Sequence, residues 1–238
     1  MNKFITAVKF LLPVVALGSF AIPTAAIIGK VGGWQFFFNQ DFNISEKINA
    51  AQRIIGWLAL LLAAYQIMLG SFRTLLEKLY GPGKILKIHM FTGPLVLGFV
   101  ILHPLLYVFY ESGINKDSIA KGLEIFIYSF NPTEKESVIN FGRLAFYGLL
   151  ITAGAAILRR KLAWRNVWKI LHFLNYGIFI FLILHIRVGA DANIWPFNAI
   201  AVIAVIFVAA GFLYRIFEKI KIIRLKKTAK IDSRRIAI

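Results

Sequence analysis

Apolar residues fill most of this 238-residue chain in long stretches, and short segments rich in charged residues separate them. A run of about 18 or more apolar residues can cross the hydrocarbon core of a bilayer as a helix. The apolar stretches cover approximately residues 4–28, 50–71, 88–110, 138–158, 168–189 and 196–217. The pattern predicts an all-α polytopic membrane protein, a bundle of six transmembrane helices that forms one domain over residues 1–238.

The composition agrees with this prediction, because 59% of the residues are hydrophobic and only 16% are charged, with a mean hydropathy of +0.72. The first stretch has one feature of a signal peptide, since Lys3 and Lys9 precede apolar residues. Its apolar part is longer than a signal peptide requires and lacks a clear small-residue cleavage site, so we expect a retained span. Pro13 and Pro23 are expected to bend or break it locally.

Charged residues are distributed unevenly among the connections, which predicts how the chain crosses the membrane. The formal net charge is +17, and the basic residues gather in the connections 72–87 and 159–169 and in the tail 218–238. Since Lys and Arg mark cytoplasmic loops, both termini are predicted to be cytoplasmic in a multi-pass protein of the cell membrane. The basic segments would face anionic lipid, and no nucleic-acid-binding module is recognisable. The long connection 111–137 contains five acidic residues and is expected to form an outer lid or a short surface helix.

The chain has four histidines, and all of them fall inside predicted spans. His89 and His103 lie 14 positions apart in the third span, and His172 and His185 lie 13 apart in the fifth. Both spans run from the cytoplasm outward in the predicted topology, so His89 and His172 share an inner level, and His103 and His185 an outer one. The separations correspond to about 21 Å and about 19.5 Å of helix rise. Polar residues at membrane depth are candidates for function, although a single such histidine is more often a packing residue.

The ligand chemistry of these levels is restricted further by the absence of cysteine, which excludes thiolate sites within the chain. Two histidines per level would leave half of a tetrahedral zinc shell empty, whereas haem iron accepts two axial imidazoles. Fourteen residues return a helix to within about 40° of its starting direction, but thirteen miss it by about 140°. We therefore expect a π-bulge or local unwinding between His172 and His185, and Gly177 would allow it.

Two segments carry a resemblance to a known family, "KIHMFTGPLVLGFVILHPLLYV" at 87–108 and "WRNVWKILHFLNYGIFIFLILH" at 164–185. They resemble the third and fifth helices of the ferric reductase-like transmembrane domain, the membrane core of NADPH oxidases, ferric reductases and bacterial relatives. The resemblance covers roughly residues 50–217. It implies two stacked haems b, one held by His89 and His172 and the other by His103 and His185.

The resemblance also implies a role for Arg53, which opens the second span at the predicted outer face and would pair with a haem propionate. An arginine that only reaches lipid headgroups is the alternative. Arg143, at the outer start of the fourth span, is a second and weaker candidate for the same role.

The sequence departs from many family members in one respect, because no glycine-rich dinucleotide fingerprint follows the last span. The expectation is an oxidoreductase membrane subunit without its own flavin and NAD(P)H domains. It would carry electrons from a cytoplasmic flavoprotein reductase (with FMN or FAD) or a membrane quinol to an external acceptor. Oxygen, a ferric chelate, a quinone and a flavin are the candidate acceptors. The residues 218–235 are interpreted as a docking or headgroup-binding segment, or as the first strand of a flavin barrel.

Two alternatives remain open at this point. One is the haem-binding membrane subunit of a periplasmic methionine-sulfoxide reductase system, a similarly short protein. The other is a non-redox transporter or assembly protein whose histidines are structural. Few charged residues lie deep in the spans, which argues against an ion-coupled pathway.

Overall fold

The computed structural model describes residues 3–115, 118–158, 165–189 and 191–236, and within these ranges the regular structure is entirely helical. The longer helices are α1 (Lys3–Lys30), α3 (Ile44–Ser71), α4 (Arg73–Tyr80), α5 (Lys84–Asn115), α7 (Glu134–Leu158), α8 (Arg165–Phe173), α9 (Asn175–His185) and α10 (Phe197–Ile236). Four short elements connect them, namely α2 (Gln35–Phe38), α6 (Ile119–Gly122) and the 3₁₀ helices η1 (Leu123–Phe126) and η3 (Ile186–Val188).

Six helical segments are long and apolar enough to cross a membrane, which confirms the predicted number of spans within the described residues. They are Ile5–Lys30, Ile44–Ser71, Lys84–Ile114, Glu134–Leu158, Val167–His185 and Phe197–Leu225. The second begins before its apolar stretch because Asn43 caps it, with the side-chain oxygen accepting a hydrogen bond from the Ser45 backbone nitrogen at 3.0 Å. A polar first turn therefore extends the helix beyond the part that hydropathy identifies.

The first span is one unbroken helix although Pro13 and Pro23 lie inside it, so of the expected bend or break the break is wrong. Proline removes a backbone donor and leaves the carbonyl four residues earlier without its helical partner. For Pro13 that carbonyl belongs to Lys9, and the Tyr80 hydroxyl of α4 donates a hydrogen bond to it at 3.0 Å. A tertiary contact thus satisfies the group that the proline exposes.

The core of the bundle forms around α3, which packs against α5, α10 and α1. One cluster joins Trp57 of α3 with Phe179 of α9 and Phe197 of α10. A second joins Ala59 and Ala63 of α3 with valines of α5. Small residues at such an interface let two helix backbones approach closely, which matters in lipid because apolar burial alone does not drive association there.

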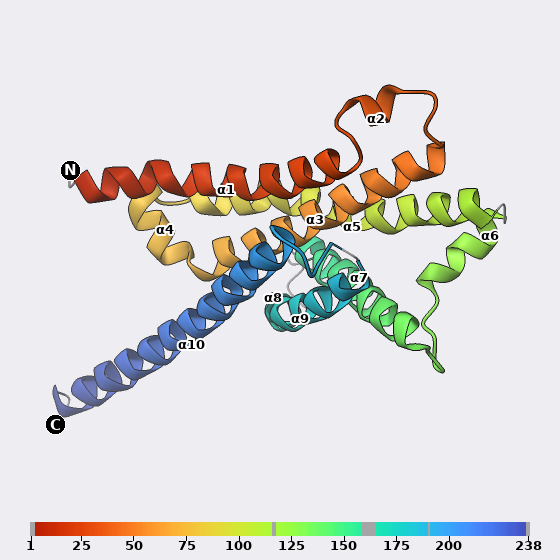
Figure 1. Cartoon of the computed structure of the whole chain (residues 1–238). Coiled ribbons are helices and arrows are strands. Elements are labelled where there is room, and N and C mark those ends of the chain that lie inside the picture. Colours follow the sequence, from red (N-terminus) through yellow and green to blue (C-terminus); the bar gives the residue numbers. More distant parts are fainter. Residues whose placement is uncertain (1–2, 116–117, 159–164, 190, 237–238) are drawn as a thin grey trace.

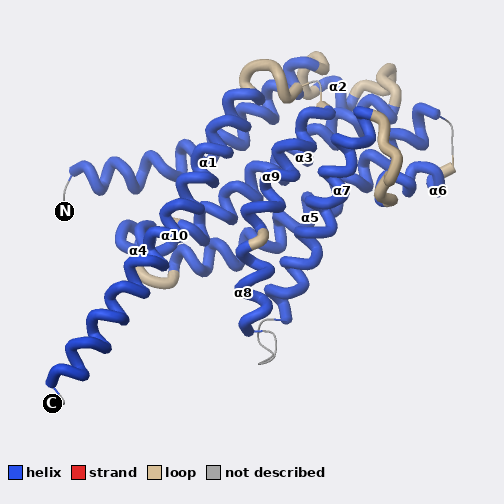
Figure 2. The backbone as a smooth tube through the Cα atoms, turned by 90° about the horizontal axis from the view of Figure 1, so that it is seen from below, coloured by secondary structure: helices blue, strands red, loops and turns tan. Residues whose placement is uncertain are grey.

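The two ends of the bundle carry different elements (Figures 1 and 2). Both chain termini lie at the end that contains α4, and α2 and α6 lie at the opposite end. We call these the α4 end and the α6 end. The connection after α5 contains α6 and η1, which confirms the expected short helix, and Gly122 of α6 is buried against α5.

The last helix continues well past its membrane segment and projects from the bundle at the α4 end (Figure 1). The alternative that residues 218–235 form a strand is therefore wrong. These residues contain no glycine or proline and are rich in lysine and arginine, which favour helix. A strand would also need a neighbouring sheet to satisfy its backbone groups.

Candidate cofactor site

Two pairs of histidines face each other inside the bundle. The ring centres of His89 on α5 and His172 on α8 lie 5.9 Å apart, with an interplanar angle of 84°. The ring centres of His103 on α5 and His185 on α9 lie 6.2 Å apart, at 81°. The structure therefore brings together the residues that the sequence predicts at equal depth. The His103–His185 pair lies nearer the α6 end, and the His89–His172 pair lies nearer the α4 end.

The spacing of both pairs fits two imidazoles on opposite sides of one metal ion. A metal–imidazole bond of about 2 Å, with the ring centre about 1.1 Å behind the nitrogen, places two such rings about 6 Å apart. No group of three or more histidine, cysteine, aspartate or glutamate residues that would hold a bare metal ion is found among the described residues. The donor set at each level is therefore two nitrogens, which suits a metal whose other ligands come from a macrocycle.

The helix is interrupted between His172 and His185, as predicted, but the expected π-bulge or unwinding is wrong, because the bonding there is partly of the tighter 3₁₀ type. α8 ends at Phe173 and α9 begins at Asn175, so the helix is interrupted at Leu174 and not at Gly177, which lies inside α9. The Leu174 backbone nitrogen donates to the Ile170 carbonyl at 3.2 Å and the Leu171 carbonyl at 3.1 Å, a mixture of α-helical and 3₁₀ bonding. Both histidines face α5 despite a spacing of thirteen residues.

Backbone carbonyls orient both rings of the His103–His185 pair. The Nδ1 atom of His103 lies 3.0 Å from the Gln52 carbonyl, and the Nδ1 atom of His185 lies 3.2 Å from the Val138 carbonyl. Only a protonated Nδ1 can donate to a carbonyl, so this geometry places the lone pair on Nε2. Metal-binding histidines typically have this arrangement, because the second nitrogen holds the ring in place.

A glycine lies beside each of these rings and opens the way to the carbonyl. Gln52 and Gly56 are four residues apart on α3, as Val138 and Gly142 are on α7. A Cβ built on Gly56 would lie 2.7 Å from Cε1 of His103, and one on Gly142 would lie 2.5 Å from Nδ1 of His185. The sequence analysis did not identify either glycine. Both could have been noticed because glycine inside a helix costs stability, so its presence indicates that another group approaches the helix backbone closely.

His172 is held between two side chains of the fifth span, one on α8 and one on α9. Its ring stacks on Trp168, with centres 5.5 Å apart and planes 26° apart, and its Nδ1 atom lies 3.3 Å from the Asn175 amide nitrogen. The Asn175 amide oxygen is buried and has no hydrogen-bond partner in the described structure. Rotating the amide by 180° would point this oxygen at Nδ1 of His172, because the two ends of an amide have nearly the same shape. Asn175, which the sequence did not indicate, can therefore orient His172.

Arg53 lies at the level of the His103–His185 pair, next to Gln52, but its guanidinium binds a carboxylate of the chain itself. It donates from Nε and Nη2 to the two oxygens of Asp191, at 2.7 Å each. Lys30, the last residue of α1, donates to the same carboxylate at 2.7 Å. Burial raises the pKa of Asp191, but the hydrogen bonds from Lys30 and Arg53 outweigh it and hold the pKa below its usual value. The role of Arg53 towards a propionate stays a prediction.

Replacing Asp191 with asparagine is expected to lower the thermal unfolding temperature in detergent at neutral pH. The Asp191 side chain is only 6% exposed, and hydrogen bonds to a charged group contribute about 1.5–3 kcal/mol each. Because the folded pKa is depressed, the contribution is present above the unfolded pKa of about 4 and is lost as the pH falls through the folded value. Melting curves between pH 3 and 7 should show a steeper acid loss in the parent than in Asp191→Asn. Parallel curves would contradict the role of this carboxylate.

Arg143, the second arginine considered, organises the α6 end. Its Nε donates to the Ile125 carbonyl at 2.6 Å, and its Nη1 donates to the side chain of Asn140 at 2.6 Å. It therefore ties η1 to α7. Its backbone neighbour Gly142 contacts His185, so Arg143 lies immediately beyond the His103–His185 pair.

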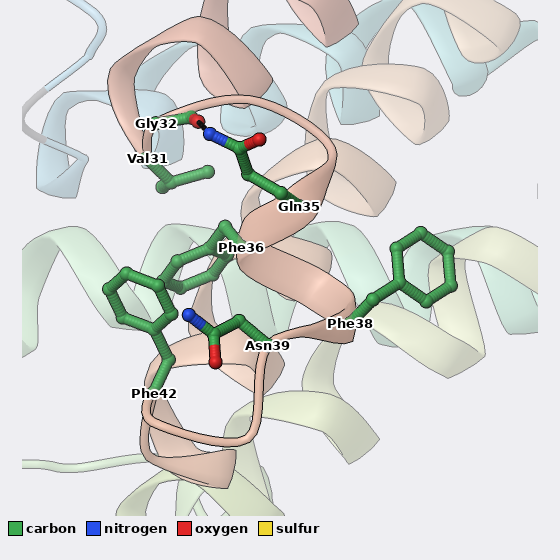
Figure 3. A pocket seen from close by; sticks show the side chains of 7 residues that line it. All are labelled: Val31, Gly32, Gln35, Phe36, Phe38, Asn39 and Phe42. Atoms are coloured by element: carbon green, nitrogen blue, oxygen red, sulfur yellow. Dashed lines mark hydrogen bonds between the residues drawn. The ribbon is translucent and has the colours of Figure 1, made fainter.

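A cavity of about 670 Å³ lies in the connection between α1 and α3, apart from the histidines. Figure 3 shows the rings of Phe36 and Phe42 next to each other, with Phe38 directed away from them. The amides of Gln35 and Asn39 complete the lining with Val31 and Gly32. No titratable side chain belongs to this lining. Exposed aromatic residues here, such as Trp34 and Phe38, fit a connection at the membrane–water interface.

The structure is a bundle with six candidate membrane spans and two pairs of facing histidines, and the comparison with known proteins places it in a family. The family model described as ferric reductase like transmembrane component matches residues 55–183, more than half of the chain. The chain belongs to this family, which fits a role in membrane electron transfer. The match includes three of the four histidines and ends just before His185. No curated protein and no solved structure matches the chain.

Proposed function

We propose that this protein carries single electrons across the membrane through two haems b, from a donor on the cytoplasmic side to an external acceptor. His89 and His172 would bind one haem iron, and His103 and His185 the other. The observation that carries the proposal is the facing of the rings at two levels, 5.9 Å and 6.2 Å apart. When bound, the haems supply iron that alternates between the ferric and ferrous states.

The side chains around the histidines have supporting roles in this proposal. The Gln52 and Val138 carbonyls hold the Nδ1 atoms of two rings. The Nε2 atom of His103 lies 3.3 Å from the Gln52 amide nitrogen, and iron would take the place of this contact. Gly56 and Gly142 leave space for those rings. Since all four histidines are then committed to iron, an acceptor would receive electrons without binding to the metal. Electron transfer between the two haem sites needs no acid–base pair, and the task of the protein there is to hold both sites in an apolar medium that excludes water.

The charge of the connections supports the proposed direction. The α4 end carries basic residues such as Lys78, Lys84 and Lys87, and the α6 end carries acidic residues such as Glu111 and Glu124. Positive loops stay in the cytoplasm, so the α4 end would be cytoplasmic and the His89–His172 pair would receive electrons first. A cytoplasmic flavoprotein or a membrane quinol would be the donor.

An absorption spectrum of the purified protein, oxidised and then reduced with dithionite, tests the proposal. We expect the bands of a low-spin b-type haem and two haems per chain after expression with sufficient haem. The absence of a Soret band under these conditions would overturn the proposal. One haem per chain would instead favour the membrane subunit of a methionine-sulfoxide reductase system.

Asn175 offers a separate test of the His89–His172 pair. Asn175→Asp should lower the reduction potential of one haem, because a carboxylate that accepts the Nδ1 proton makes the imidazole a stronger donor to iron. Asn175→Leu should shift the same potential upward. Spectroelectrochemical titration measures both, with Thr24→Val on α1, whose hydroxyl donates to the Phe20 carbonyl, as a control. Equal shifts in the two variants would exclude an electronic role for this side chain.

A further inference from the structure

A second cavity, of about 280 Å³, lies at the α6 end between α5, the α6–η1 segment and α7. Tyr107 and Ser112 line it from α5, Gly122 from α6, and Ile139 and Arg143 from α7. Its volume is at the lower limit of ligand pockets, which measure about 300–1,000 Å³. It has room for one small ring and not for a large chelate.

The cavity begins where the His103–His185 pair ends. Tyr107 lies one helical turn beyond His103 on α5. Ile139 follows Val138, whose carbonyl orients His185, and Arg143 follows Gly142, which contacts the same ring. A molecule in this cavity would therefore lie directly beyond the outer electron site of the proposed function.

The charges of the lining restrict the chemistry of an occupant. The carboxylates of Glu111, Glu124 and Glu136 outnumber the two cations, Lys121 and Arg143. This balance disfavours an anion such as a ferric citrate complex. The described residues also contain no group of three metal-ligating side chains, which disfavours a bare metal ion.

Hydrogen-bond donors in the lining favour a neutral molecule with carbonyl oxygens. The Ser112 hydroxyl is buried and has no hydrogen-bond partner in the described structure, so a ligand can satisfy it. The Tyr107 hydroxyl donates to Glu111 at 2.5 Å, and Arg143 contributes a fixed positive charge beside them. Positive charge and donors stabilise an oxygen that becomes negative on reduction, and Ile125 and Ile139 provide apolar walls for a ring.

From these observations we propose that the cavity binds a small quinone-type carbonyl compound and is the site where the external acceptor is reduced. This inference rests on the proposed function, which supplies the electrons. The acceptor takes two electrons, one at a time, from the outer site and two protons from external water. Its two C=O groups become C–OH groups, and the Tyr107–Glu111 pair passes protons from water to oxygen.

The experiment uses the haem-loaded protein, reduced with dithionite and mixed anaerobically with duroquinone. Ile139→Phe fills the cavity, and Ile151→Phe places the same ring on an exposed face of α7, where residue 151 is 58% exposed. We expect Ile139→Phe to slow reoxidation by duroquinone at least about tenfold. The phenyl ring would occupy the cavity, and a ligand ring would then no longer fit. Ile151→Phe should leave the rate unchanged, and ferricyanide, an anion that needs no cavity, should reoxidise both variants at the parent rate.

Ser112→Ala provides a milder second variant. Its half-saturating duroquinone concentration should rise about fivefold to tenfold, the loss expected for one hydrogen bond. Unchanged duroquinone kinetics in both cavity variants, with haem spectra intact, would overturn the cavity proposal alone. Equal slowing with duroquinone and ferricyanide would also overturn it, because the substitutions would then act on the haem site. Absence of the haem spectrum in the parent protein would overturn the proposed function instead.

Discussion

Substitution of His103 by leucine is expected to lower the haem content from two groups to one per chain and to reduce electron transfer across the membrane to background. Leucine has a similar size but no nitrogen, so the His103–His185 pair would lose one of its two axial donors. The His89–His172 pair lies about 21 Å away along α5, a distance of 14 residues in a helix, and should keep its group. Haem quantification and the reduction of ferricyanide on the far side of proteoliposomes measure the two effects.

Thr92→Val is a matched control for this prediction, because Thr92 lies on the same helix and bonds to Gln66 rather than to a histidine ring. It should retain two haems. Loss of both haems in His103→Leu, with the fold intact by circular dichroism, would contradict two independent levels. Retention of both would show that His103 is not a ligand.

Gly142→Ala is expected to remove the same haem although it replaces no haem ligand. A Cβ at this position would lie 2.5 Å from Nδ1 and 2.6 Å from Cε1 of His185, well inside the contact distance of about 3.5 Å or more between such atoms. The imidazole is rigid, so the ring must move away from the Val138 carbonyl. A ligand displaced by about 1 Å loses its geometry, and we expect haem content to fall towards one per chain.

Gly154→Ala is the control, since Gly154 lies on the same helix and a Cβ there would meet nothing within 4 Å. Alanine favours an α-helix over glycine by about 1 kcal/mol, so this variant should bind both haems and melt no lower than the parent. The same substitution would then have opposite consequences on one helix. Equal haem content in the two variants would show that the close approach at Gly142 is not required.

The histidine levels were predictable because they depend on local quantities. The rise of a helix and the spacing of His89, His103, His172 and His185 determine the depth of each residue once the spans are known. The same spacing predicted an irregularity in the fifth span, but not its position. The interruption lies at Leu174, and the spacing of the two histidines does not select that residue among the twelve between them.

The binding partner of Arg53 could not be predicted from the sequence. Its depth beside the outer histidines could be predicted, but its partner Asp191 is 138 positions away in a short connection that carries no motif. Gly56 and Gly142 are a similar case. A glycine inside a helix has several physical explanations, and only the position of the opposing ring distinguishes a close approach from the others.

By itself, the sequence determined the six spans, the paired depths of the four histidines and the charge difference between the two ends. These follow from the length of apolar runs, the rise of a helix and the distribution of lysine and arginine. The tertiary structure decided which carbonyl orients each outer ring, which glycines leave room for those rings, and which carboxylate binds Arg53. It also brought Tyr107, Ser112 and Arg143 around one cavity. All of these depend on contacts between helices distant in the chain, and such contacts exist only after the helices have packed.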